Sequence, residues 1–310
     1  MPNILHGYDQ EFNLLASIYN KKNLPNKILF SGKKGIGKSL LASHFINFIF
    51  SKNELNPYDI NEKLIYDNNR SFNLVENKTH PNFFNIYKKK DKKFIEISQI
   101  RELYSFINKS SFDDNLKIVL IDDAESLTIN ASNSLLKLVE EPNYNVQFII
   151  IQDNSKFILE TLKSRCIEFK LTLNEIFIPK IVNQIHKSDI FDKLNNDFKF
   201  VYLTPNDYLN LFNFCNKNEI VLESATIEDV LGKIVNKSLY KFNQMNVSEI
   251  KLYLEIFIRK KYIQKKSTKY LEYSNIFNKK LSNVIKYNLD LETFFIELNN
   301  ELVLWKLILT

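Results

Sequence analysis

The feature that most constrains this chain is a glycine-rich loop between a short apolar run and a helical pattern. Residues Lys27-Ile28-Leu29-Phe30 form the run, and residues 38–50 carry apolar side chains at helical spacing. Between them the sequence reads Gly32-Lys33-Lys34-Gly35-Ile36-Gly37-Lys38-Ser39, which matches G-x-x-x-x-G-K-S/T. Because this motif stands between a predicted strand and a predicted helix, it predicts a phosphate-binding loop in an α/β domain.

The residue types of this loop suit the binding of a nucleotide triphosphate. The glycines let the backbone curl so that successive N–H groups point inward, and the following helix adds its positive dipole end. Lys38 places a charge on the β and γ phosphates, and Ser39 offers a hydroxyl to Mg²⁺. ATP and Mg²⁺ are therefore the predicted ligands. The alternative is a chance glycine turn, with strand, loop and helix in register by coincidence.

An acidic pair follows another apolar run, at residues 117–121. Asp122 is predicted to hold Mg²⁺, directly or through water. Many P-loop ATPases place a water-polarising glutamate at the next position, where this chain has Asp123. Aspartate is one methylene shorter, so its carboxylate lies ~1 Å back, and a misplacement of that size can cost about a hundredfold in rate. We expect the site to bind nucleotide and to hydrolyse it poorly. The alternative for both aspartates is a solvated helix cap.

The remaining hydrophobic pattern predicts a parallel α/β sheet followed by helices. Continuous apolar runs separated by helical segments are typical of strands buried on both faces. The further predicted strands are 83–87, 117–121, 146–151 and 166–169. After residue 170 helical patterns dominate, as in 249–266 and 291–309, and Pro205 can start a helix.

Composition excludes several classes of protein. The formal net charge is +6, but arginine contributes only four of the 42 basic residues, a lysine bias that we attribute to an AT-rich genome rather than to a DNA-binding surface. Two cysteines are too few for a disulfide framework or a four-cysteine zinc site. The sequence has no apolar run of about 20 residues and no signal-peptide pattern, so we expect a cytoplasmic protein without a membrane span.

Several further segments resemble the AAA+ clamp-loader ATPases. The strongest are Asn133–Pro142 and the triplet Ser164-Arg165-Cys166. Segments 4–7, 23–26, 79–83 and 97–103 also resemble this family. The resemblance is specific over residues 1–170 and thin afterwards.

The resemblance implies a three-part chain and a set of partners. The parts are an AAA+ core at 1–170, a small helical lid at 171–215 and an all-α collar at 216–310. The collar would join other clamp-loader subunits in a hetero-pentamer. That ring opens the sliding clamp and places it on primed DNA, as a component of a DNA-directed DNA polymerase.

Arg165 is a further candidate catalytic residue, and it lies outside the phosphate loop. A planar guanidinium can bind phosphate oxygens through two donors, which lysine cannot do. From spacing alone, an ion pair within the fold is an equal alternative. The resemblance favours an arginine finger supplied in trans to a neighbour's ATP site, which makes this chain a stator.

Two departures from the family pattern bear on the site. Residues 51–79 contain no cysteine, so no zinc is expected, and residues 204–209 lack the arginine that some active relatives place in the lid. With Asp123, the second departure predicts weak or absent ATPase activity of this chain. The sensor residue after the fourth strand is either Asp153 or Asn154.

Three functions remain open at this point. The first is the stator, and the second is an active ATP-hydrolysing motor subunit of the same machine, favoured by the intact loop. The remote third is a small-molecule kinase, which would need an acceptor pocket that the sequence does not reveal.

Overall fold

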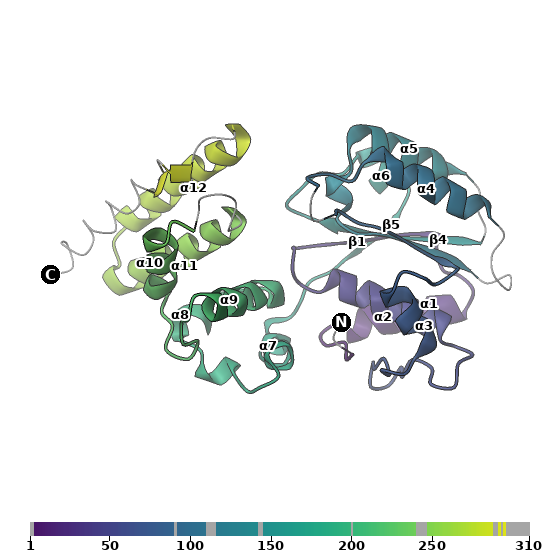
Figure 1. The fold of residues 1–310 in the computed structure, drawn as a ribbon, viewed down its shortest axis with the longest axis horizontal. Coiled ribbons are helices and arrows are strands. Elements are labelled where there is room, and N and C mark those ends of the chain that lie inside the picture. Colours follow the sequence, from purple (N-terminus) through teal and green to yellow (C-terminus); the bar gives the residue numbers. More distant parts are fainter. Residues whose placement is uncertain are drawn as a thin grey trace. The chain divides into compact units, whose positions relative to one another are not determined.

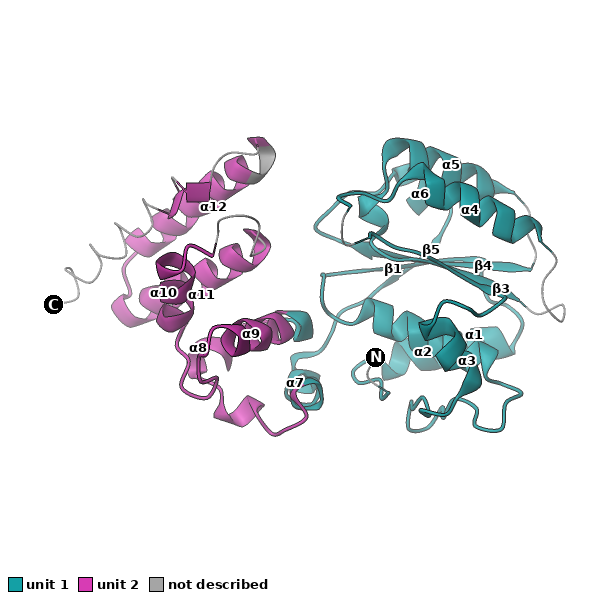
Figure 2. Cartoon of the chain, viewed as in Figure 1, with its two compact units in different colours: residues 1–185, 204–206 teal, residues 186–203, 207–310 magenta. Residues whose placement is uncertain are grey.

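The computed structural model describes residues 3–89, 92–109, 116–141, 145–199, 201–239, 247–287, 291–292 and 294–295. The chain folds into two compact units (Figure 2). Unit 1 comprises residues 1–185 and the short segment Thr204–Asn206, and unit 2 comprises residues 186–203 and 207–310. The three-part division into core, lid and collar remains a prediction.

Unit 1 is built on a five-stranded sheet in which every neighbouring pair is parallel. The strand order is β2-β3-β4-β1-β5. All eight residues of β4 are buried, as expected of a central strand covered on both faces. The strands are β1 (Lys27–Gly32), β2 (Phe83–Ile86), β3 (Lys117–Ile121), β4 (Val146–Asp153) and β5 (Ile167–Lys170).

Helices cover both faces of this sheet (Figure 1). One face carries α1 (Asp9–Asn20), α2 (Lys38–Phe50) and α3 (Arg70–Glu76), and the other carries α4 (Ile97–Asn108), α5 (Ile129–Glu140) and the short α6 (Glu160–Lys163). Short 3₁₀ turns lie at η2 (Ala124–Ser126) and η3 (Glu175–Phe177), and α7 (Ile178–His186) follows the sheet. This arrangement places the loop that follows β1 beside the loop that follows β3.

The helix α5 shows how local sequence sets the packing. The Thr128 hydroxyl caps its first turn by accepting from the Ala131 N–H at 3.2 Å. Leu135, Leu138 and Val139 are buried against the sheet, and Leu136 lies at the edge of that cluster, half-buried.

All the regular secondary structure in the described part of unit 2 is helical, and turns and loops connect the helices. It contains η4 (Phe191–Lys193), α8 (Asn196–Lys199), α9 (Pro205–Lys217), α10 (Ile227–Asn236), α11 (Val247–Lys265) and α12 (Lys269–Tyr287), with the first two residues of α9 assigned to unit 1. Helix α9 begins at Pro205, as the sequence predicted, and α11 matches the predicted helix 249–266. Most of the predicted helix 291–309 lies outside the described residues.

These observations confirm the predicted fold class, an α/β parallel sheet followed by a helical region.

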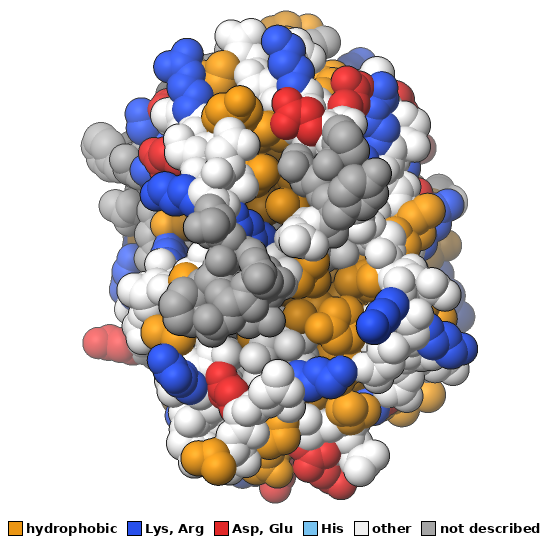
Figure 3. Space-filling view, turned by 90° about the vertical axis from the view of Figure 1, so that its right-hand side faces the viewer, with side chains coloured by type: hydrophobic (Ala, Val, Ile, Leu, Met, Phe, Trp, Pro, Cys, Tyr) orange, Lys and Arg blue, Asp and Glu red, His pale blue; other side chains and the backbone are white. Residues whose placement is uncertain are grey.

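Figure 3 shows a face of unit 1 on which apolar side chains gather around a hollow, with Lys and Arg side chains beside it. Within the described segments, no helix is long and apolar enough to cross a bilayer.

Candidate functional site

The glycine-rich loop joins β1 to α2 at the carboxyl end of the sheet. Gly35 and Gly37 have positive φ angles of 84° and 99°, a conformation that side chains other than glycine rarely adopt. The side chains of Lys33 and Lys34 point into solvent, whereas Ile36 is buried. The loop therefore offers its backbone, rather than those two lysine side chains, to a ligand.

Lys38 is held inside the loop. Its side chain is buried, and its Nζ donates to the carbonyl oxygens of Gly32 at 2.8 Å and Lys33 at 2.7 Å. Burial lowers the pKa of this amine, while nearby carboxylates, led by that of Asp153 and followed by that of Glu125, act in the opposite direction. The ammonium group thus lies within the reach of several acids, at the place where phosphate charge would bind.

Ser39 and Asp122 meet beside the loop. The Ser39 hydroxyl donates to Asp122 Oδ2 at 2.9 Å, and the Asp123 N–H donates to Asp122 Oδ1 at 3.0 Å. Burial raises the pKa of the Asp122 carboxyl. A hydroxyl and a carboxylate are oxygen donors of the kind that Mg²⁺ prefers, so these two residues fit that ion.

Asp123 has an unusual backbone conformation. Its φ is 56° and ψ is 48°, in the left-handed region, and it precedes the 3₁₀ turn η2. Aspartate tolerates this region better than most residues. Glu125, two residues further on, accepts from the Asp153 N–H at 3.1 Å and so brings a third acid to the site. Sequence reasoning did not single out Glu125.

The two candidate sensor residues have different surroundings. Asp153 is buried at the end of β4, in register with Gly32, and its carboxylate accepts from the N–H and hydroxyl of Ser155 at 3.0 and 2.8 Å. Asn154 is exposed and its N–H donates to the Gly32 carbonyl at 3.2 Å. The Asp153 carboxylate is therefore the one that lies near Lys38.

Two contacts that no sequence pattern predicts support the loop. The buried Tyr8 hydroxyl donates to the Ile36 carbonyl at 2.7 Å. At the tip, Asn206 N–H donates to the Gly35 carbonyl at 3.3 Å, and a Cβ on Gly35 would lie 2.5 Å from Thr204 Oγ1. Glycine at position 35 is thus required both by its φ and by this close approach.

Arg165 lies at the surface, immediately after α6. Its guanidinium pairs with Glu140 Oε1 at 2.5 Å and donates to the Thr161 carbonyl at 2.8 Å. Its side chain is 38% exposed and that of Glu140 is 50% exposed, so the pair is in contact with water. Burial raises the pKa of the neighbouring Cys166 thiol to about 11, which keeps it protonated and unreactive at neutral pH. In the described part of the chain, no group of three or more His, Cys, Asp or Glu side chains is arranged so that it could hold a metal ion by itself.

The sheet and the loop together define a P-loop domain of the AAA+ type. A gamma subunit-related protein of DNA polymerase III from Thermotoga maritima has a similar fold, with a TM-score of 0.55 over 95% of this chain and 98% of its own, at 16% identity. Residues 7–175 match a family described as DNA polymerase III, delta subunit. The chain belongs to that family.

Curated relatives agree with this assignment. The chain is 30% identical over 140 residues to the DNA polymerase III subunit delta' of Pseudomonas aeruginosa, a match that covers 45% of this chain and 41% of the relative. It is 30% identical over 156 residues to the delta' subunit of Bacillus subtilis, covering 49% and 44%. The matched segment thus spans less than half the length of these relatives.

Proposed function

We propose that this chain is a delta-prime-type clamp-loader subunit that acts in DNA replication as a stator. Family membership over residues 7–175 supports this role, as do the delta' names of the relatives. In this role the chain assembles with other clamp-loader subunits into a hetero-pentamer. The complex binds the sliding clamp and carries it to primed DNA in the cytoplasm, within a DNA-directed DNA polymerase.

The surface position of Arg165 carries the stator proposal. An exposed ion pair of this kind contributes about 0–1 kcal/mol, so Glu140 can release the guanidinium at little cost. Once released, the guanidinium is free to bind phosphate oxygens on an adjoining subunit through two donors. A finger supplied in this way can accelerate phosphoryl transfer by ~10³–10⁵ at the site it serves.

Reconstitution of the complete loader with variants of this chain tests the proposal. Arg165→Ala is expected to lower clamp-stimulated ATP hydrolysis by at least about tenfold. Arg165→Lys keeps the charge but loses the bidentate geometry, so it should remain strongly impaired. Glu140→Gln frees the arginine and should retain activity. A loader that hydrolyses ATP and loads clamps normally with Arg165→Ala would show that the stator assignment is wrong.

An active motor is the second candidate, and the contact between Ser39 and Asp122 favours it. If ATP and Mg²⁺ bind, Ser39 and Asp122 would hold the ion, which shields phosphate charge during transfer. The loop amides from Gly35 to Ser39 would hold the phosphates, and Lys38 would exchange its two carbonyl acceptors for phosphate oxygens. Asp123 is too short to place water as a glutamate would.

The two candidates separate on the activity of the isolated chain. A stator hydrolyses ATP negligibly by itself, and a loader containing Lys38→Ala keeps working. A motor loses clamp loading with Lys38→Ala, whereas the exposed Lys34→Ala leaves it intact. Affinity purification of the tagged chain, followed by identification of co-purifying loader subunits and clamp, tests the partners in either case.

A further inference from the structure

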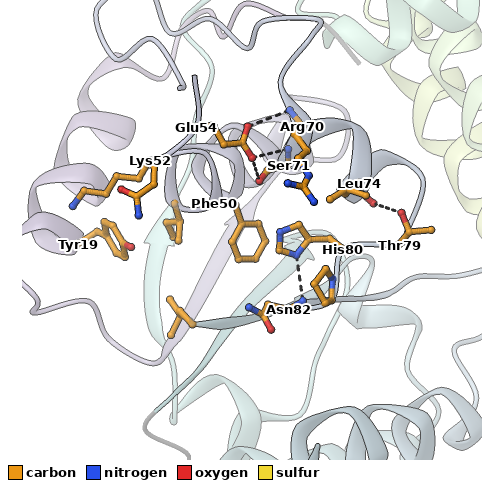
Figure 4. A pocket seen from close by; sticks show the side chains of 14 residues that line it. Tyr19, Phe50, Lys52, Glu54, Arg70, Ser71, Leu74, Thr79, His80 and Asn82 are labelled. Atoms are coloured by element: carbon orange, nitrogen blue, oxygen red, sulfur yellow. Dashed lines mark hydrogen bonds between the residues drawn. The ribbon is translucent and has the colours of Figure 1, made fainter. Parts of the chain in front are cut away.

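A cavity of about 610 Å³ (Figure 4) lies near the amino ends of β2 and β3, whereas the phosphate loop follows the carboxyl end of β1. This size falls in the ~300–1,000 Å³ range of ligand pockets. Its walls come from the ends of α1 and α2, the start of α3 and the segments that precede β2 and β3. Its lining includes Tyr19, Phe50, Lys52, Glu54, Arg70 and His80.

An aromatic pair forms one wall of this pocket. The rings of Phe50 and His80 stack with centroids 4.0 Å apart and an interplanar angle of 18°. Burial lowers the pKa of His80, so its imidazole is neutral at pH 7. Tyr19 lies on the side of the pocket near Lys52 (Figure 4). Flat, uncharged rings of this kind are surfaces on which nucleobases stack.

Two cations lie on different sides of the ring pair. The Arg70 side chain extends toward His80, and Lys52 Nζ lies 6.0 Å from the centroid of the Tyr19 ring (Figure 4). Among the described residues, neither cation makes an ion pair or a side-chain hydrogen bond. Both charges are therefore available to an anion from solvent.

Glu54, an acidic residue of the pocket, is already hydrogen-bonded within the fold. Glu54 Oε2 accepts from the Arg70 N–H at 3.1 Å, and Glu54 Oε1 accepts from the Ser71 N–H at 3.0 Å and from the Ser71 hydroxyl (Figure 4). These contacts direct the carboxylate to the first turn of α3. The charges left facing a ligand are those of Lys52 and Arg70.

We propose that this pocket binds a nucleotide unit, with its base against the Phe50–His80 pair and its phosphate on Arg70 or Lys52. Guanidinium and ammonium groups are strong phosphate donors, and stacking on aromatic rings tolerates any base. A free nucleoside monophosphate and one residue of a single strand share this chemistry. Cations on two sides of the ring pair also suit a strand, in which each base has a phosphate on either side.

Fluorescence anisotropy on the full chain tests the site with two probes, mant-labelled AMP and a short fluorescein-labelled oligodeoxythymidylate. AMP lacks the β and γ phosphates that the phosphate loop binds, so Lys38→Ala should leave its affinity unchanged. For AMP, one of the two variants Arg70→Gln and Lys52→Gln should weaken binding about tenfold, because the single phosphate contacts one cation. For the oligonucleotide, both variants should weaken binding about tenfold, as expected from loss of a charged hydrogen bond. Phe50→Leu should weaken it by about tenfold through lost stacking.

Lys156→Gln removes one exposed lysine elsewhere on unit 1 and should leave binding unchanged. Both pocket cations are on exposed residues, so their variants should keep the wild-type circular dichroism spectrum. Binding of AMP alone identifies a free nucleotide as the ligand, and binding of the oligonucleotide alone identifies a strand. The proposal is wrong if neither probe binds, or if Arg70→Gln, Lys52→Gln and Lys156→Gln bind the probes with equal affinity. It is also wrong if polyglutamate binds and neither nucleotide probe does.

Discussion

The hydroxyl of Ser39 donates to the carboxylate of Asp122 at 2.9 Å, although 83 positions separate the two residues in the sequence. The parallel sheet makes this contact possible, because β1 and β3 both end at the same edge, on either side of β4. The pair brings two oxygen donors together beside the loop that holds Lys38.

Replacement of Lys38 by alanine should weaken binding of Mg²⁺ and a non-hydrolysable ATP analogue to the isolated chain by at least about tenfold. A charged hydrogen bond to phosphate contributes roughly 1.5–3 kcal/mol, which corresponds to that factor or more. Isothermal titration calorimetry measures the change. Lys34→Ala removes an exposed lysine of the same loop and should bind as the wild type does. Equal loss in both variants would indicate a general charge effect.

Asp122→Asn should stabilise the fold at neutral pH while it weakens Mg²⁺-dependent nucleotide binding. The pKa of this carboxyl is raised by burial, so the folded state holds its proton more tightly than the unfolded state. Stability from this group is therefore present below the unfolded pKa of 3.8 and is lost as the pH rises through the folded pKa. Asparagine has no such titration.

Urea unfolding at several pH values measures this difference. The gap between Asp122→Asn and the wild type should be largest at pH 7 and should close toward pH 3. A gap that is independent of pH would contradict the linkage to this carboxyl.

Gly35→Ala should destabilise unit 1 by about 1–3 kcal/mol. Alanine pays a conformational cost at a φ of 84°, and its Cβ would lie 2.5 Å from Thr204 Oγ1. Gly232→Ala is the matched control, because no atom lies within 4 Å of a Cβ placed there, inside helix α10. That control should stabilise unit 2 by about 0.5–1 kcal/mol. Opposite signs in thermal unfolding are the expected result.

Lys260→Met should destabilise unit 2 far more than Lys251→Met. Lys260 Nζ lies 2.7 Å from both Asp197 and Glu228, and the Lys260 and Asp197 side chains are only 20% and 10% exposed. Loss of the Lys260 ammonium group leaves the largely buried Asp197 carboxylate without that compensating charge, at a cost on the order of 2–3 kcal/mol. The pair of Lys251 with Glu255, 3.8 Å apart and over 40% exposed, should cost less than about 0.5 kcal/mol.

The sequence predicted the sheet well because its strands are long apolar runs. The predicted strands 117–121 and 146–151 match β3 and the first six residues of β4. The order in which strands pair was not predictable, since β1 lies between β4 and β5, which follow it by more than a hundred residues.

The site was predictable where a motif encodes it. Ser39 and Asp122 follow from the loop pattern and from an acid at a strand end. Tyr8 and the Thr204–Asn206 segment could not be predicted, because their contacts with the loop depend on the tertiary path of the chain. Glu125 lies outside the motif, and its contact with Asp153 depends on the 3₁₀ turn in which it lies.

The hydrogen bonds of Lys38 have a consequence for affinity. Its ammonium group already has two acceptors from the backbone of its own loop, at 2.8 and 2.7 Å. An arriving nucleotide must therefore compete with those carbonyls. The binding free energy that Lys38 contributes is the difference between its hydrogen bonds to phosphate oxygens and its hydrogen bonds to the two carbonyls. Variation that shifts the Gly32 and Lys33 carbonyls by a few tenths of an ångström can thus tune nucleotide occupancy without altering any residue that touches the ligand through its side chain.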